Sequence, residues 1–424
     1  MPLTTSSLSA AEFESSRFAA PARRIRWILF AAMSLSSAAA IATATVNSIV
    51  GADLGGGAAW AGVPSATILI GSALAAPLWG RAFDRIGRRG GLAAGLAFGL
   101  VGSAIAGLAL VLAALPVFLL GLTLIGVSGA AVGLSRFAAG EVHPPELRAR
   151  AISTVVLGGA VGSIAGPLLV APSGLAAAGG GWSELAGPYG AAILLYGAAA
   201  AAVFLLLRPD PRSLGRDVAA AYGGEAVRDE PARPIGVILR GRAAALAVAA
   251  MTLGQMVMIM VMVMTSVHMR EHQHALSSIS LVIGAHTFGM FAFSVISGRL
   301  ADRKGRLPVI AAGSATLVLA SLAAPLSTSV LPLAISLFSL GLGWNFCYVG
   351  GSALLADQLR PSEAARTQGF NDLLVGAASA VGSLASGIVF AAIGFAAMAA
   401  FGAAVALIPL ALAIAWRRTA MATA

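Results

Sequence analysis

Methionine and histidine residues recur at helical spacing in the third quarter of the chain. His286 and Met290 lie four residues apart, and Met258 and Met262 repeat that spacing earlier. In an α-helix, residues four apart share one face. Thioether sulfur and neutral imidazole are ligands for soft metal ions such as Cu(I), and they carry no charge that must be desolvated while the site is empty. These four residues therefore form a candidate metal site.

The same residues also have ordinary structural explanations. Methionine is a flexible gap-filler, so a Met-rich helix can pack against its neighbours or line an adaptable apolar surface. A buried histidine can serve only to hydrogen-bond a neighbouring helix. The register of the first pair stays open as well, because Met256 with Met260, or Met260 with Met264, has the same spacing.

The elements that must position these residues are membrane-spanning helices. The chain of 424 residues is 58% hydrophobic and only 10% charged, which is too little charge for a soluble surface. A helix that crosses ~30 Å of hydrocarbon needs ~20 apolar residues. Twelve stretches meet this requirement: residues 25–50, 60–80, 91–113, 115–138, 150–172, 187–207, 242–268, 275–298, 308–326, 329–356, 367–391 and 393–416. The sequence predicts an all-α membrane protein with twelve transmembrane helices.

The distribution of basic residues predicts the orientation. If the amino terminus is cytoplasmic, all of the 27 Lys and Arg residues except Arg270 lie on or near the cytoplasmic side. Positive residues near span ends set orientation, so we expect both termini in the cytoplasm of a bacterium and the helices in its inner membrane. The net charge of +10 is then a topology signal, and no nucleic-acid partner is expected.

A loop motif occurs twice, which indicates a duplicated six-helix unit. Gly80–Arg88 reads GRAFDRIGR, and Gly298–Arg306 reads GRLADRKGR. The aspartate of each motif is expected to pair with loop arginines and to cap a neighbouring helix, which would hold one face of the protein closed. A basic loop that serves only topology is the alternative. The residues assigned to these gating loops are Gly80, Asp84, Arg85, Arg88, Gly298, Asp302, Arg303 and Arg306.

The duplication divides the chain into two pseudo-symmetric bundles. The predicted parts are a cytoplasmic tail (1–22), a six-helix bundle (23–207), a cytoplasmic linker (208–241), a second six-helix bundle (242–418) and a short cytoplasmic tail (419–424). Parallel halves of this kind are a known transporter plan.

The sequence resembles the major facilitator superfamily over the whole chain, and the repeated loop motif is the feature that carries this resemblance. Within it, Met258-x-x-x-Met262 followed by His286-x-x-x-Met290 resembles the CcoA-like branch of copper importers. That resemblance implies alternating access between two bundles, these four residues as the copper site, and copper delivery for cytochrome c oxidase assembly. It implies copper as a transported substrate rather than a cofactor, with a downstream copper chaperone as a partner.

Further polar residues could serve the same pathway. His268, His272 and His274 lie in a predicted external loop and could collect metal, or could simply be solvated. The other polar residues expected along a cavity are Asn47, Gln255, Asn345 and Cys347. No nucleophile–base set suggests an enzyme. Two alternatives to copper import remain: a carrier of a small organic molecule, riboflavin-like or a drug, and a non-transporting membrane sensor or assembly factor.

Overall fold

The computed structural model of the protein describes residues 10–221 and 233–422. Over these residues the chain is helical, with no strand. The helices of the first half are α1 (Ala10–Ser15), α2 (Ala19–Gly55), α3 (Val63–Leu112), α4 (Leu115–Gly133), α5 (Ser135–Glu141), α6 (Pro145–Gly179) and α7 (Gly187–Leu206). Two short helices, α8 (Pro211–Ala221) and α9 (Ile235–Leu239), lie in the predicted linker. Part of that linker, 222–232, lies outside the described residues, as do 1–9 and 423–424.

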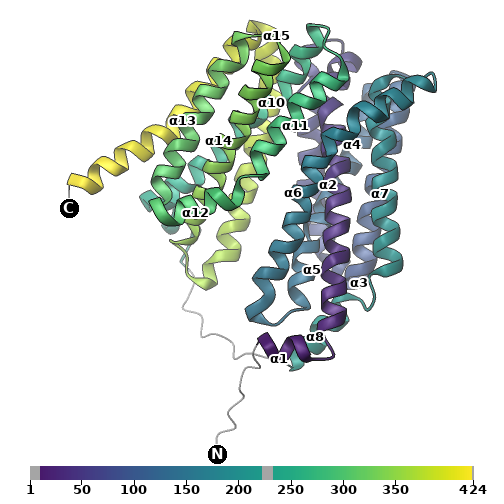
Figure 1. Ribbon diagram of the computed structural model, residues 1–424, viewed down its shortest axis with the longest axis vertical. Coiled ribbons are helices and arrows are strands. Elements are labelled where there is room, and N and C mark those ends of the chain that lie inside the picture. The colour runs from purple at the N-terminus through teal and green to yellow at the C-terminus, as the bar shows by residue number, and fades with distance from the viewer. Residues whose placement is uncertain (1–9, 222–232, 423–424) are drawn as a thin grey trace, which may run out of the picture. The chain divides into compact units, whose positions relative to one another are not determined.

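The helices of the second half follow the linker. They are α10 (Arg242–Glu271), α11 (Leu276–Phe291), α12 (Ser294–Lys304), α13 (Arg306–Ala323), α14 (Val330–Ala356) and α15 (Pro361–Ala422). Helices α10, α11 and α13 all pack against α14, and the ribbon shows them side by side (Figure 1).

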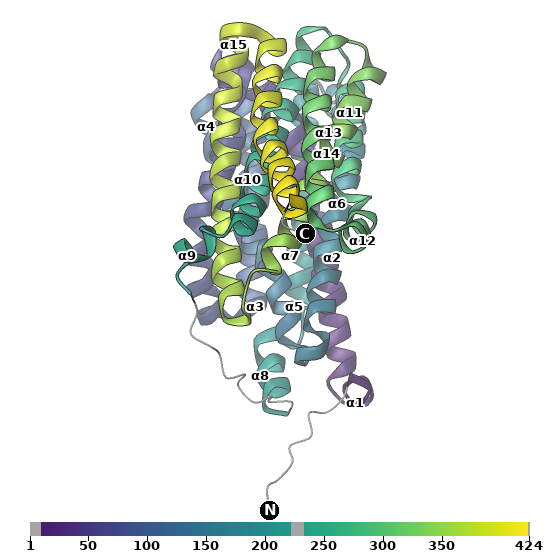
Figure 2. The same ribbon diagram turned by 90° about the vertical axis from the view of Figure 1, so that its left-hand side faces the viewer.

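Ten helical segments within the described residues are long and apolar enough to cross a membrane. Two of them, Ala58–Leu112 and Arg366–Trp416, are long enough for two crossings. Each is interrupted by one non-helical glycine, Gly87 with φ 79° and Gly394 with φ 81°. Dividing both segments at these glycines gives the twelve spans that hydropathy predicts. The two arms of α15 lie beside α10 (Figure 2).

The chain forms two compact units. Unit 1 comprises residues 1–43, 70–169 and 175–227, and unit 2 comprises 44–69, 170–174 and 228–424. The division therefore differs from two contiguous bundles, because 44–69 belongs with the second half. The Ser383 hydroxyl donates to the Gly62 carbonyl at 2.8 Å, and Gly62 has no side chain to prevent this approach.

Small residues allow the helices of unit 2 to come close together. At Gly341 of α14 an added Cβ would lie 2.3 Å from the His286 carbonyl oxygen of α11. At Gly289 of α11 it would lie 2.4 Å from the Phe338 carbonyl oxygen of α14. In lipid, helix association depends on such close packing. These reciprocal glycines set the position of His286.

Candidate functional site

His286 lies inside unit 2, between α11 and α14, with none of its surface exposed. Its Nδ1 is 2.9 Å from the carbonyl oxygen of Leu337 in α14. Because a carbonyl can only accept, Nδ1 carries the proton and Nε2 keeps a lone pair. Nε2 is buried and has no hydrogen-bond partner in the described residues. The ring is therefore oriented by one nitrogen and open at the other.

The methionines of α10 divide between different neighbours. Met256 faces α15, since an added Cβ on Gly382 would lie 3.0 Å from its Cγ. Met251 is already bound, because its sulfur accepts from the Ser352 hydroxyl at 3.3 Å and from the Asn371 amide at 3.6 Å. Met258 is buried, whereas Met262 is half-buried. On α11, Met290 is also half-buried.

A half-exposed aromatic surface lies next to this region. Trp344 of α14 donates its indole N–H to Oε1 of Gln255 at 2.6 Å. Its ring stacks on Tyr348, with centroids 5.0 Å apart and an interplanar angle of 23°. Phe291 of α11 meets it edge-on at 6.1 Å. All four side chains are half-buried, so this surface, Gln255–Phe291–Trp344–Tyr348, presents ring faces and edges for contact.

Three other residues expected along a cavity are buried. The Asn345 amide donates to the Met290 carbonyl at 2.6 Å and to Ser294 at 2.9 Å, which ties α14 to α11 and α12. Cys347 has no exposed surface and lies 3.5 Å from the hydroxyl of Ser314 in α13. Asn47 is also fully buried. The side chains of Asn345 and Cys347 thus serve helix packing.

The three histidines near the end of α10 contact different neighbours. The His268 ring stacks on Phe395, with centroids 4.4 Å apart, and lines a 640 Å³ cavity. His272 Nδ1 is 2.8 Å from the His268 carbonyl, and His274 Nε2 is 2.7 Å from the Thr328 carbonyl. Over the described residues, no three His, Cys, Asp or Glu side chains are placed to hold a metal together. A preformed collecting site of that kind is absent from the part described.

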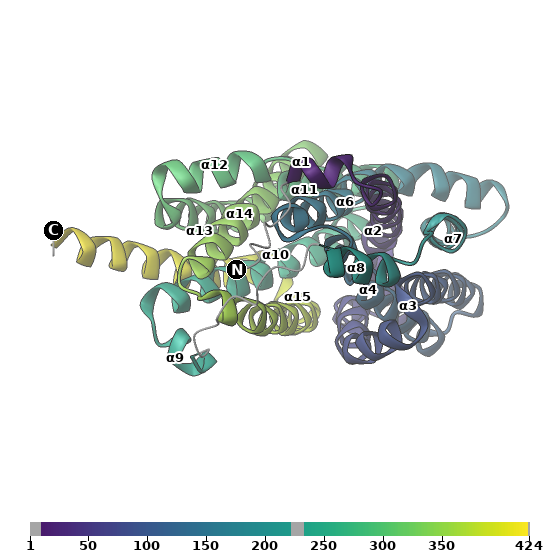
Figure 3. The ribbon, with the colours of Figure 1, turned by 90° about the horizontal axis from the view of Figure 1, so that it is seen from below.

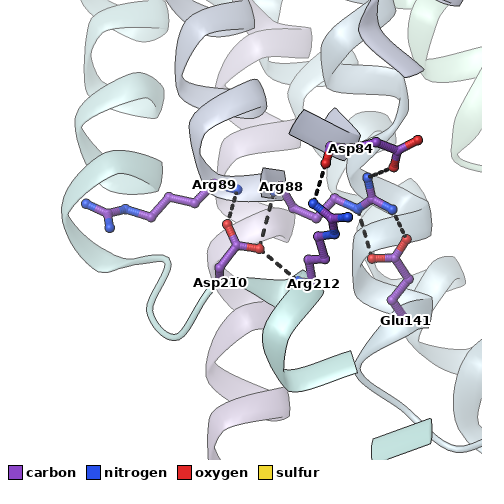
Figure 4. A network of polar contacts seen from close by, with 6 residues as sticks. All are labelled: Asp84, Arg88, Arg89, Glu141, Asp210 and Arg212. Atoms are coloured by element: carbon purple, nitrogen blue, oxygen red, sulfur yellow. Dashed lines mark hydrogen bonds and ion pairs between the residues drawn. The ribbon is translucent and has the colours of Figure 1, made fainter. Parts of the chain in front are cut away.

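The first gating loop is built around Arg88 (Figure 4). Arg88 begins the second arm of α3, the helical part that follows Gly87 and ends at Leu112. Its guanidinium donates two hydrogen bonds to Glu141 of α5, at 2.9 and 2.6 Å, and a third to Asp84 at 3.1 Å. A bidentate arginine–carboxylate pair is among the stronger charge-assisted contacts. The predicted pairing of Asp84 with a loop arginine is confirmed.

The second gating loop repeats this arrangement. Arg306 donates to Asp357 at 2.9 Å and forms an ion pair with Asp302 at 3.3 Å. The arginine and both carboxylates occupy corresponding places in the two halves, so the duplication read from the sequence extends to side-chain contacts. Arg85 and Arg303 are exposed, and an added Cβ on Gly80 or Gly298 would meet no atom within 4 Å.

Asp210, which the sequence analysis did not single out, caps two helices (Figure 4). Its carboxylate accepts from the backbone N–H groups of Arg88 and Arg89, at 3.3 and 3.0 Å, and so caps the second arm of α3. It also accepts from the Arg212 N–H at 2.8 Å, at the start of α8. Asp followed by Pro211 is a typical helix-start signature, which could have identified it.

A buried carboxylate, Glu363, fastens the end of the linker to α15. Glu363 has no exposed surface and binds both the Arg233 guanidinium, at 2.7 Å, and the Arg233 backbone N–H, at 2.9 Å. The backbone N–H of Arg360 adds a further bond at 3.0 Å. The hydrogen bonds from Arg233 hold the pKa of the Glu363 carboxyl well below its usual range. The carboxylate is therefore charged at neutral pH.

Comparison with known proteins places this architecture in a family. The family model of the Major Facilitator Superfamily matches residues 28–273 and 246–422. The chain is 32% identical to YdeG of Bacillus subtilis (strain 168), an uncharacterized MFS-type transporter, over 91% of this chain and 90% of YdeG. It is 28% identical to the riboflavin transporter RfnT of Brucella anthropi, over 84% of this chain and 86% of RfnT.

Solved structures agree on the fold. The human organic anion transporter MFSD10 superposes with a TM-score of 0.60 at 17% identity, covering 93% of this chain and 99% of MFSD10. The peptide transporter POT superposes with a TM-score of 0.66 at 12% identity, covering 92% of this chain and 94% of POT. This chain is a multi-pass membrane protein of the Major Facilitator Superfamily.

Proposed function

We propose that this protein is a secondary transporter that imports copper across the bacterial cytoplasmic membrane by alternating access, with both termini in the cytoplasm. The observation that supports this cargo is the state of His286. A buried nitrogen lone pair without a partner costs free energy, so a ligand that binds Nε2 would be stabilised there. Metal-binding histidines commonly donate their second ring N–H to a carbonyl, as His286 does to Leu337.

The contacts of the other α10 methionines favour one register of ligands. Met251 is bound to Ser352 and Asn371, and Met256 packs toward α15. Met258 and Met262 lie on a different face of α10 from Met256, because a two-residue offset rotates the side chain by about 200°. We therefore assign Met258, Met262, His286 and Met290 as the copper ligands. Sulfur and imidazole bind Cu(I) without a charged cage, and a downstream copper chaperone would receive the ion.

The test is copper uptake into vesicles that contain the purified, full-length protein. His286→Ala should reduce uptake at least about tenfold, because even second-shell changes at metal sites cost 10–100-fold. The double variant Met258→Leu, Met262→Leu should do the same, since leucine keeps volume but offers no donor. The matched control is Met256→Leu, Met260→Leu, which should transport normally. Undiminished copper uptake by both His286→Ala and the first double variant would exclude the site.

A second candidate cargo is a planar organic molecule, such as riboflavin. The half-exposed Gln255–Phe291–Trp344–Tyr348 surface favours it, because a flat ring system can stack on Trp344 while Gln255 offers a polar contact. The similarity to the riboflavin transporter RfnT supports the same candidate.

Riboflavin uptake in the same vesicles separates the two cargoes. If riboflavin is the cargo, Trp344→Ala abolishes its uptake, and Met258→Leu, Met262→Leu is tolerated because apolar volume is kept. If the folded wild-type protein moves neither copper nor riboflavin in reconstituted vesicles, a sensor or assembly factor built on the same scaffold becomes the better description.

A further inference from the structure

A cavity of 600 Å³ lies at the basic end of unit 1. Its walls come from the second arm of α3, from α5, from the first turns of α6 and from α8. Helix α8 reaches this position because Gly215 packs directly on the backbone of Glu141, where an added Cβ would lie 2.9 Å from the carbonyl oxygen. Figure 3 shows α8 at this end of the unit.

Arginines dominate the polar lining of this cavity. Four line it, together with a single carboxylate, Glu141: they are Arg88, Arg148, Arg212 and Arg216. Glu141 is already bound to Arg88, which also pairs with Asp84. The carboxylate of Asp210 is bound by backbone N–H groups. The carboxylates of Glu141 and Asp210 are therefore committed to other partners, whereas Glu146 of α6 and Asp217 of α8 are exposed and lie outside the cavity lining.

The other three arginines have no carboxylate partner within the described residues. Arg148 donates only to the His143 carbonyl, at 3.2 Å, and Arg212 donates to the Asp84 carbonyl. Arg216 makes no hydrogen bond or ion pair in the described part of the chain and is exposed. Three guanidinium groups thus line one concave surface, and the one carboxylate in that lining is paired with Arg88 instead. Such an arrangement concentrates positive potential and attracts an anion.

The chemistry of the lining specifies the anion further. The guanidinium fork matches the oxygens of phosphate, which it can bind with two parallel hydrogen bonds. Between the arginines the wall is apolar, with Phe137, Ile152 and Ala219. Ile152 and Arg148 lie in the first two turns of α6, a helix long and apolar enough to span the membrane. A ligand that joins a phosphate to an apolar stem at the membrane edge fits this lining best.

We propose that this cavity is a binding site for a phosphate-bearing anion, and that the phosphate belongs to an anionic glycerophospholipid. A soluble phosphate ester offers the same head chemistry without the apolar stem. A bound lipid phosphate, with one negative charge, accepts hydrogen bonds from Arg148, Arg212 and Arg216, and so fastens α8, the first helix of the linker, to α6.

The test measures binding of phosphatidylglycerol, phosphatidylcholine and glycerol 3-phosphate to the full-length protein in detergent, by titration and by the shift in thermal unfolding. Phosphatidylglycerol should bind and phosphatidylcholine, which has no net charge, should not. Arg148→Gln, Arg216→Gln should weaken phosphatidylglycerol binding about tenfold per arginine, as expected for a charge-assisted hydrogen bond. Both side chains are exposed, so the variant should fold, which size-exclusion chromatography verifies.

The matched control is Arg81→Gln, Arg85→Gln, which removes two exposed charges from the same end but outside the cavity lining. It should change phosphatidylglycerol binding by less than about twofold if proximity to the phosphate matters. Equal losses of phosphatidylglycerol binding in both double variants would overturn the site in favour of a diffuse surface effect. Unchanged binding in both would overturn it as well, because the cavity arginines would then not contact the lipid. Glycerol 3-phosphate binding as tightly as phosphatidylglycerol would overturn the lipid as the source.

Discussion

Gly87 should be among the positions of unit 1 least tolerant of a side chain. Its φ of 79° and ψ of 170° lie in a region essentially restricted to glycine. An added Cβ would also lie 2.6 Å from Oδ2 of Asp210, the carboxylate that caps the following helix arm. Gly87→Ala therefore strains the backbone and displaces the cap at once.

The expected cost follows from these two effects. A non-glycine residue in such a conformation costs of order 1–3 kcal/mol, and loss of a helix cap costs about 1 kcal/mol. Gly87→Ala should thus destabilise unit 1 by about 2–4 kcal/mol. For domains of this size, 1 kcal/mol corresponds to roughly 2–4 °C in the unfolding midpoint. Thermal unfolding of the purified protein, followed by intrinsic fluorescence, resolves a decrease of several degrees.

Two other glycines separate the contributions. Gly305 occupies the corresponding bend with φ 89° and ψ 161°, but its added Cβ would meet only the Pro308 ring, at 3.8 Å. Gly305→Ala should show the backbone strain alone. Gly80→Ala, in helical backbone with open space, should be neutral or slightly stabilising. The reasoning fails if Gly87→Ala unfolds at the same temperature as Gly80→Ala, or if Asp210→Ala adds its full effect to that of Gly87→Ala.

Two further predictions concern unit 2. Because the folded pKa of Glu363 lies below its unfolded value, its charge stabilises the fold above about pH 4.3, and this contribution is lost as pH falls further. The unfolding midpoints of wild type and Glu363→Gln should therefore differ at pH 7 and converge in acid; a constant gap would contradict this. Gly341→Ala should reduce copper uptake although all four proposed ligands are kept, because its Cβ would lie 2.3 Å from the His286 carbonyl oxygen and would push α11, with the His286 ring, away from α14. Gly376→Ala, in open space, is the control, and equal uptake by the two would refute the positioning role.

Hydropathy and repetition were enough to predict the twelve spans and the paired loops. Both features depend on averages over many residues or on a motif that occurs twice. The bend at Gly87 falls between two predicted spans, and the bend at Gly394 lies at the second residue of the predicted span 393–416; at both, a glycine-only conformation reverses the chain. The Asp84–Arg88 and Asp302–Arg306 pairs were predictable because residues four apart in a helix are neighbours.

Contacts between distant elements were not predictable in this way. Asp210 reaches the helix after Gly87 only because α7 returns to the same end of unit 1. The faces of α14 were equally obscure, because a helix that is apolar all round gives no periodic signal for its buried side. Asn345 and Cys347 were therefore expected along a cavity, although both lie in helix packing. Whether the methionine and histidine set binds copper is a prediction that the fold leaves untested.

The placement of charged and neutral residues indicates how a cargo could drive the conformational change of the proposed carrier. The arginine–carboxylate groups around Arg88 and Arg306 lie at the helix ends, whereas the proposed ligands inside unit 2 are neutral. A Cu(I) ion bound there would bring one uncompensated charge into a low-dielectric interior, so the loaded and empty proteins would differ in electrostatic energy. A ligand shifts a conformational equilibrium only by its differential affinity for the two states, and a buried charge is a strong source of such a difference. A neutral riboflavin-like cargo has no net charge, so it cannot produce this electrostatic difference between the two states. Its differential affinity would have to come from ring contacts at Trp344 instead, so the two cargoes require different physical drivers for the same rocking motion.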